Sequence, residues 1–227
     1  MSIWTRISEA LAALASGESL SEVFSRLKSP PERSVAFTIA IISLGAKMAK
    51  ADGEVSRTEV SAFRCIFAIP PGEEKNAARV FNLARQDVAG FEHYARRIAR
   101  MFSHQKQVRI DILEGLFHVA VADGGFHPAE DAFLTEVARI FGLGDGCYRA
   151  IRARVVPGAP RDPYDVLGVD HGAPISQVRN AWKKAVRESH PDRMIARGVP
   201  PEAIRLAERR LIDINTAWEE INAKQAA

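Results

Sequence analysis

The stretch Ile175-Ser-Gln-Val-Arg-Asn-Ala-Trp-Lys-Lys-Ala-Val-Arg-Glu-Ser-His-Pro-Asp192 decides the fold of the C-terminal part of this chain. Its apolar residues recur at spacings of three and four, which predicts an amphipathic helix over 175–189. Pro191 disfavours helical geometry in the residue before it, so we expect the helix to end at His190. The triplet His190-Pro191-Asp192 is therefore predicted to lie in a loop, where recognition groups are common.

The polar face of this predicted helix carries a basic stripe. Arg179, Lys183 and Arg187 follow one another at intervals of four, and Lys184 lies beside them. Residues four apart share one face of a helix. On an isolated helix such a stripe is usually a solvated face. Directly before the His-Pro-Asp triplet, we interpret it as a surface that steers the approach of an acidic partner.

The residues before this helix predict a short helix over 163–168. Asp162 is a suitable N-cap, Pro163 suits the first helical position, and Gly168 suits the end. Tyr164 and Leu167 are three apart and should face the core.

The residues after the triplet predict a longer helix over 201–222. We expect it to pair antiparallel with the 175–189 helix, with Met194 to Val199 in the connecting loop. Its expected buried stripe is Ala207, Leu211, Ile214, Trp218 and Ile221.

The segment Pro163-Tyr-Asp-Val-Leu-Gly-Val169, together with the His-Pro-Asp triplet and Leu211-x-x-Ile214, resembles a J-domain of the DnaJ type. This resemblance implies docking on a DnaK-type ATPase and acceleration of its ATP hydrolysis. The implied trigger and docking residues are His190, Pro191, Asp192, Arg179, Lys183, Lys184 and Arg187. The sequence departs from the family pattern at Pro174, where many members have a Ser or Thr cap. It lacks a Gly/Phe-rich linker and zinc-binding cysteine repeats, so we expect no client-binding arms of the full DnaJ kind.

The N-terminal part contains an internal repeat. The segment Met48-Ala-Lys-Ala-Asp-Gly-Glu-Val-Ser-Arg-Thr-Glu59 aligns without a gap with Val119-Ala-Val-Ala-Asp-Gly-Gly-Phe-His-Pro-Ala-Glu130. In each copy a helix ends, the chain turns at Asp-Gly and another helix starts. Ser56 and Glu59 form a capping box, and Pro128 and Glu130 suit the first and third helical positions. The pattern predicts a duplicated helix-turn-helix.

The repeat resembles the TerB-like domain of tellurite-resistance proteins over about residues 32–145. A TerB-like region followed by a J-domain is the layout of the DjlA family. We therefore expect an all-α protein, a helical bundle followed by a small domain with an antiparallel helix pair. The expected parts are an N-terminal extension (1–31), a TerB-like domain (32–154), a linker (155–162) and a J-domain (163–227).

A divalent-cation site is the alternative reading of the two Asp-Gly turns. If the turns converge, the ligands would be Asp52, Glu59, Asp123 and Glu130. Turn and capping roles explain the same residues, and hard cations need six or more oxygens. We therefore predict no metal, but a metal- or stress-responsive protein acting through its TerB-like domain remains the alternative function.

Composition excludes several other classes. The chain has 227 residues with 31 basic and 28 acidic side chains, a net charge of +3, which does not indicate a nucleic-acid partner. The two cysteines lack metal spacing, and no catalytic motif or cofactor loop is present, so we expect no enzyme and no cofactor. We find no signal peptide or membrane span and predict a cytoplasmic protein. The apolar helix predicted over 3–15 could instead touch the inner membrane peripherally. Neither the client nor homo-oligomer formation is determined by the sequence.

Overall fold

The computed structural model describes residues 32–51, 90–159, 162–200 and 204–226, together with Arg6, Ile7, Glu9, Ala10, Ala12, Ala13 and Ser16. All regular secondary structure in these residues is helical. The helices are α3 (Glu32–Ala51), α6 (Phe91–Met101), α7 (Lys106–Ala120), the 3-10 turn η1 (Val121–Asp123), α8 (Pro128–Ile140), α9 (Asp145–Val155), α10 (Pro163–Leu167), α11 (Ile175–Glu188), α12 (Pro191–Ala196) and α13 (Ile204–Ala226). The all-α fold class is confirmed.

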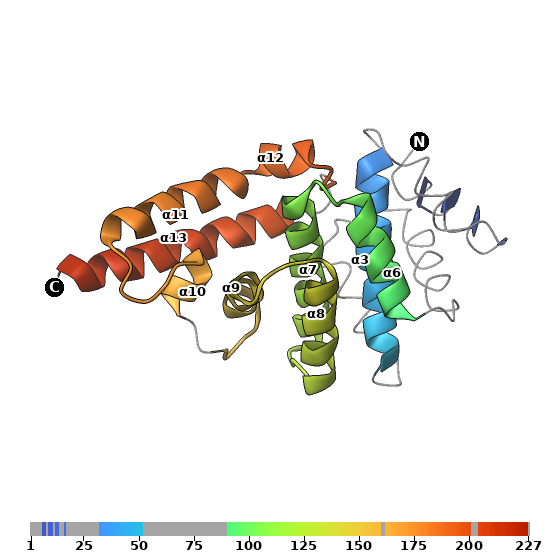
Figure 1. Cartoon of the computed structure of the whole chain (residues 1–227), viewed down its shortest axis with the longest axis horizontal. Helices are drawn as coiled ribbons and strands as arrows, with labels where there is room; N and C mark the ends of the chain where they lie inside the picture. The colour runs from blue at the N-terminus through green and yellow to red at the C-terminus, as the bar shows by residue number, and fades with distance from the viewer. Residues whose placement is uncertain are drawn as a thin grey trace.

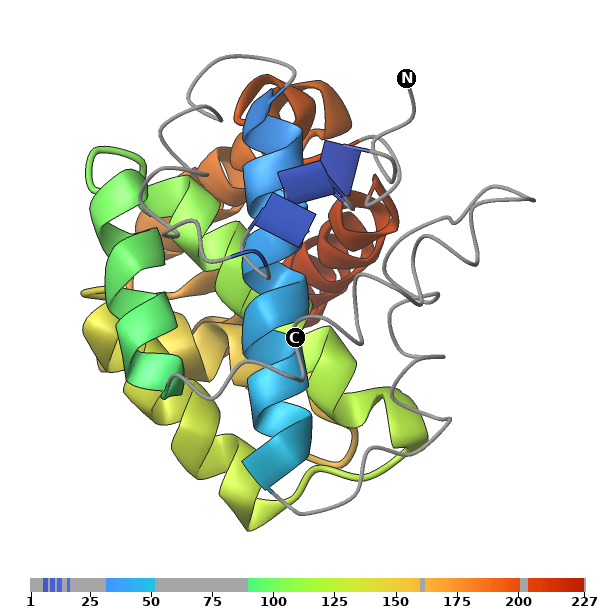
Figure 2. The same ribbon diagram turned by 90° about the vertical axis from the view of Figure 1, so that its right-hand side faces the viewer.

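The described helices form an elongated molecule with two ends (Figure 1). Helices α3, α6, α7 and α8 pack side by side at one end, and α10, α11 and α13 lie at the other. Seen along the long axis, α3 crosses the front of the molecule with α6 beside it (Figure 2). The N-terminal bundle is held by a core that includes Phe37, Phe117 and Phe141, each fully buried.

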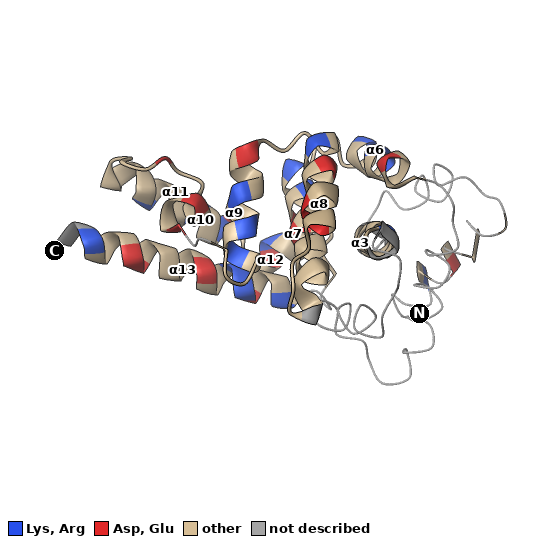
Figure 3. Ribbon diagram, turned by 90° about the horizontal axis from the view of Figure 1, so that it is seen from below, with Lys and Arg blue, Asp and Glu red and all other residues tan. Residues whose placement is uncertain are grey.

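Helix α9 lies between the two ends and carries three arginines that reach three different helices. Arg149 pairs with Asp165 of α10 at 3.4 Å, and Arg152 pairs with Asp131 of α8 at 3.5 Å. Arg154 pairs with a carboxylate of α7, described below. Figure 3 shows these basic positions along α9. The two exposed pairs contribute little stability each, whereas the pair of Arg154 is buried.

The second copy of the repeat has the predicted local structure. Helix α7 ends at Ala120, and Gly124 has φ +93°, a conformation that favours glycine. Pro128 then opens α8 at its first position. The Oε2 of Glu130 accepts a hydrogen bond from the backbone N–H of His127 at 2.8 Å, as a capping glutamate should. In the first copy α3 ends at Ala51, and the rest lies outside the described residues.

The C-terminal helices also follow their predicted signals. The Oδ1 of Asp162 accepts from the N–H of Tyr164 at 2.9 Å, and Gly168 ends α10 with φ +68°. Helices α11 and α13 pack together as an antiparallel pair. Trp182 stacks on Trp218 with ring centroids 5.1 Å apart. The small core of this end consists of Val166, Leu167, Ala173, Val178, Ile214, Ala217 and Ile221.

Two expectations need correction. The triplet and the segment after it do not form a simple loop, because Pro191–Ala196, which includes two residues of the triplet, forms the helix α12. The chain is non-helical only at Ser189 and His190, and Pro191 begins the new helix. The same ring that disfavours helical geometry at His190 is preorganised for a first helical position. The last helix extends to Ala226, beyond the predicted end at residue 222. The apolar spacing of segments 19–28, 56–69 and 73–88 also predicts helices, and these segments lie outside the described residues.

The two ends of the molecule share one core. Met194, Val199, Leu206 and Ala207 are at most 1% exposed and belong to the same hydrophobic cluster as the N-terminal bundle. These residues come from α12, the segment after it and the start of α13. The C-terminal helices are therefore packed against the bundle rather than tethered to it. Ile7 is also fully buried in this cluster, which favours docking of the first predicted helix on the protein itself.

Candidate partner-binding site

The triplet forms a tight turn where α11 meets α12: His190 lies between the helices, and Pro191 and Asp192 are the first two residues of α12. His190 is the N-cap of α12 in an extended conformation, with φ −61° and ψ 133°. Its Nδ1 accepts a hydrogen bond from the N–H of Asp192 at 3.2 Å. Its carbonyl accepts from the N–H groups of Arg193 and Met194, at 3.0 and 3.1 Å. Met194 is fully buried, so the turn is anchored at one side in the core.

Both polar side chains of the turn are open to a partner. The side chain of His190 is 56% exposed and that of Asp192 is 86% exposed. Because Nδ1 of His190 accepts a hydrogen bond, neutral His190 carries its proton on Nε2. Outward from the turn, the molecule thus offers one N–H donor and one carboxylate. The carboxylate suits a bidentate arginine on another protein.

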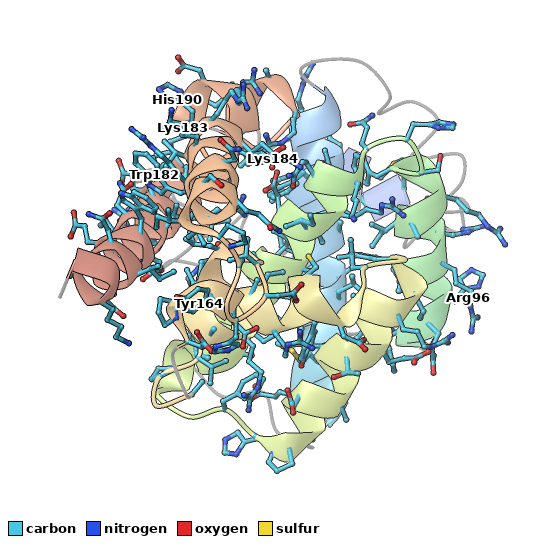
Figure 4. All side chains as sticks on the ribbon, turned by 60° about the vertical axis from the view of Figure 1, so that its left-hand side comes forward. Arg96, Tyr164, Trp182, Lys183, Lys184 and His190 are labelled. Atoms are coloured by element: carbon cyan, nitrogen blue, oxygen red, sulfur yellow. The ribbon has the colours of Figure 1, made fainter. Side chains whose placement is uncertain are left out.

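The predicted docking residues lie on α11, and all of them are exposed: Arg179, Lys183, Lys184 and Arg187. They do not form one flat patch. Figure 4 shows Lys183 and His190 on the outer side of α11, whereas Lys184 lies on the side that faces the bundle. Lys183 therefore lies on the same side of the molecule as His190, whereas Lys184 lies on the side of the N-terminal helices.

A cluster of buried charges joins α7 to the C-terminal helices, and the sequence reasoning missed it. Asp111 and Glu114 of α7 are 0% and 1% exposed. Arg210 of α13 bridges them, with Nη1 2.8 Å from Oδ1 of Asp111 and Nε 3.0 Å from Oε1 of Glu114. Arg154 of α9 donates to Oε2 of Glu114 at 2.7 Å. Each carboxylate has two arginine partners, since Asp111 also accepts from Arg197.

Arg197 follows α12 and reaches two helices at once. Its Nε and Nη2 donate to Oδ2 of Asp111 at 3.1 and 2.9 Å. Its Nη1 donates to the backbone carbonyl of Glu188 at 2.9 Å. The side chain of Glu188 is held from the same direction, because Nε2 of Gln107 donates to its Oε2 at 2.6 Å. Two residues of α7 thus hold the end of α11, two positions before His190.

The charges of the cluster are strongly stabilised. Burial alone would raise the pKa of Glu114, but the guanidiniums of Arg154 and Arg210 outweigh burial and lower it to about 2. Burial would lower the pKa of Arg210, and Glu114 and Asp111 instead raise it. Nearby, burial lowers the pKa of His118 to about 4. Arg209, Arg210 and Arg154 add to that effect, and Glu114 opposes it.

The cluster left a faint signal in the sequence. Asp111 and Glu114 are three apart on a helix whose neighbours are almost all apolar. Arg210 lies between Ala207 and Ile214 on the predicted buried stripe. A charge on an apolar stripe indicates a buried partner of opposite sign, because an unpaired buried charge is costly. The sequence does not show which partner, since the paired residues are 96 and 99 positions apart.

Of the four residues proposed for a cation site, two lie in the part of the chain that the structure describes. Asp52 and Glu59 lie outside it, and Glu130 takes part in helix capping. Asp123 lies in the turn η1. Among the described residues, no group of three or more His, Cys, Asp or Glu side chains could hold a metal ion. Within the same residues, no helix is both long and apolar enough to cross a membrane.

The fold and the site define a class: an all-helical protein in which a helical bundle packs on an antiparallel helix pair with an exposed His-Pro-Asp turn. Residues 38–153 match the family described as "Tellurite resistance protein TerB". The match covers just over half of the chain, and the chain belongs to this family.

Similarity to curated proteins extends across both parts of the chain. The chain is 24% identical over 220 residues to "Co-chaperone protein DjlA" of Photobacterium profundum, covering 86% of this chain and 79% of that protein. It is 25% identical over 227 residues to the protein of the same name from Shewanella oneidensis, covering 92% and 84%. The Coxiella burnetii protein of that name is 26% identical over 194 residues, covering 77% and 72%. The resemblance to DjlA-type proteins is thus confirmed. No solved structure matches the chain.

Proposed function

We propose that this protein is a co-chaperone that binds a DnaK-type ATPase and stimulates its ATP hydrolysis. The segment 163–227 acts as the J-domain, and the TerB domain directs localisation or client choice. The observation that supports this proposal most directly is the exposed turn of His190, Pro191 and Asp192 where α11 meets α12. In this proposal the protein is a regulator, and the catalytic groups belong to the partner ATPase. The names of the similar proteins support the same role.

In this proposal the basic residues of α11 and the residues of the turn contribute to partner binding in different ways. Arg179, Lys183 and Arg187 attract an acidic surface and raise the rate of encounter. His190 and Asp192 then supply the short-range contacts, an N–H donor and a carboxylate held by the start of α12. Long-range attraction is screened by salt, whereas the short-range contacts are screened much less. The two contributions can therefore be separated experimentally.

A single-turnover ATPase assay with the cognate DnaK-type chaperone tests the proposal. The wild-type chain should accelerate hydrolysis, and the His190→Gln variant should not. His104→Gln is the matched control, because His104 is exposed but lies in the turn between α6 and α7. If the wild type gives no acceleration, or if His190→Gln accelerates as well as the wild type does, the proposed function is wrong.

A second candidate is a metal- or stress-responsive role of the TerB domain, favoured by the family match over residues 38–153. Calorimetric titration of the full chain with divalent cations tests it. Heat of binding that disappears in an Asp52→Asn/Asp123→Asn double variant would support this candidate. A titration without heat of binding would remove it.

A further inference from the structure

Arg197 connects the buried charge cluster to the end of α11, and the proposed function leaves this connection unused. Its guanidinium is 2.9 Å from Oδ2 of Asp111 through Nη2 and 2.9 Å from the carbonyl of Glu188 through Nη1. The last carbonyls of a helix have no partner within the helix. Arg197 satisfies one of them with a charged donor, which is also favourable at the negative end of the helix dipole.

The other side of Arg197 is fixed by the bundle. Asp111 is fully buried, and its second oxygen is held by Arg210 at 2.8 Å. Gln107, one helical turn before Asp111, holds the side chain of Glu188 at 2.6 Å. Helix α7 therefore holds Glu188 at two points, through its backbone by way of Arg197 and through its side chain directly.

We propose that Arg197 and Gln107 are positioning residues for the His190-Pro191-Asp192 turn, so that the TerB domain sets the geometry of the turn toward the ATPase. This inference rests on the proposed function. Neither residue touches the partner in this proposal. They act by fixing Glu188, two residues before His190, while buried Met194 fixes the opposite side of the turn. A turn held at both sides loses little conformational entropy on binding, and small displacements of such groups are costly.

The Arg197→Lys variant separates positioning from stability. A lysine keeps a positive charge beside Asp111, but one ammonium on a flexible stem cannot reproduce a planar bridge between Asp111 and Glu188. We expect maximal ATPase stimulation to fall roughly ten-fold, which corresponds to about 1.4 kcal/mol. The protein concentration at half-maximal stimulation should stay close to that of the wild type, because the basic stripe of α11 is unchanged. Arg205→Lys, at an exposed position of α13, is the matched control.

The Gln107→Met variant tests the same idea from the TerB domain. It removes the hydrogen bond to Glu188 without leaving a buried charge, so it decides the question if Arg197→Lys does not fold. Maximal stimulation should fall about three-fold, close to the loss of one ordinary hydrogen bond. An independent readout is amide hydrogen exchange, which should accelerate in both variants at Ser189 and Arg193, whose N–H groups donate to Ala185 and His190. The exchange rates should remain unchanged in Arg205→Lys.

The outcomes are distinguishable from those of the proposed function. If the wild type stimulates, His190→Gln does not, and both positioning variants match the wild type in maximal stimulation, positioning by α7 is wrong and the co-chaperone function stands. If the wild type itself does not stimulate ATP hydrolysis, the co-chaperone function and the positioning role are both wrong. Loss of stimulation with unchanged half-saturation and faster exchange at the turn supports the proposal.

Discussion

Replacement of Glu114 by glutamine should strongly destabilise the protein. Glu114 is 1% exposed and accepts hydrogen bonds from Arg154 at 2.7 Å and from Arg210 at 3.0 Å. Glutamine keeps the size but removes the charge, which leaves two buried guanidiniums with reduced compensation. Breaking one side of a buried ion pair typically costs about 3–5 kcal/mol.

The pKa of Glu114 allows an independent magnitude for the same change. The pKa falls from the usual 4.5 to about 2, and each pKa unit corresponds to about 1.36 kcal/mol, so ionisation of Glu114 adds a net stabilisation of about 3 kcal/mol. The folded-state pKa lies below the unfolded-state value. This stabilisation is therefore fully present above about pH 4.5 and is lost as the pH falls toward 2. We expect the Glu114→Gln variant to lose about 3 kcal/mol at neutral pH.

Urea unfolding followed by circular dichroism measures this loss. Glu136→Gln is the matched control, because Glu136 pairs with Arg139 on the surface and its loss should not be measurable. The Glu114→Gln/Arg154→Met double variant should recover part of the stability, since it removes the arginine whose ion pair is with Glu114 and leaves Arg210 paired with Asp111. A loss of less than about 1 kcal/mol in Glu114→Gln would contradict the view that these buried ion pairs stabilise the fold.

Three further predictions follow from the same structure. The folded-state pKa of His118 is about 4 against the usual 6.5, so the unfolded chain takes up a proton first and the protein loses stability as the pH falls from about 6.5 toward 4. The free energy of unfolding of a His118→Gln variant should depend less on pH in that range. An unchanged pH dependence would contradict this. Gly168→Ala should destabilise by about 1 kcal/mol because φ is +68°, whereas Gly146→Ala within α9 should stabilise by up to about 1 kcal/mol, both measured by urea unfolding; equal effects would contradict the backbone argument. Charge reversal at Lys183 and Arg187 should weaken chaperone docking most at low salt, with helicity unchanged; a salt-independent effect in the ATPase assay would exclude steering.

The local signals of the chain were readable from the sequence. The cap at Asp162, the left-handed Gly168 and the capping role of Glu130 were predicted and are present. So was the apolar stripe that includes fully buried Val178. Each depends on residues within four positions, where side-chain size, a backbone N–H and a φ preference decide the outcome. The end of α11 just before His190 was predictable for the same reason.

Helix α12 was not predicted, because Pro191 has two effects that the sequence alone does not rank. It ends the preceding helix and also suits the start of the next one. Burial of Met194 in the shared core favours the second effect. The energetic balance between loop and helix was thus decided by packing against the bundle.

Local sequence patterns were enough to predict α10, α11 and α13, the cap at Asp162 and the end of α11 before His190. The shared core of the two parts, and the cluster of Asp111, Glu114, Arg197 and Arg210, depend on contacts between helices that are far apart in the sequence. A buried carboxylate requires a partner of opposite charge, but the sequence contains many arginines that could be that partner. The choice is made when packing brings α7 and α13 together across about a hundred residues, because Coulomb attraction acts over distance in space and not along the chain.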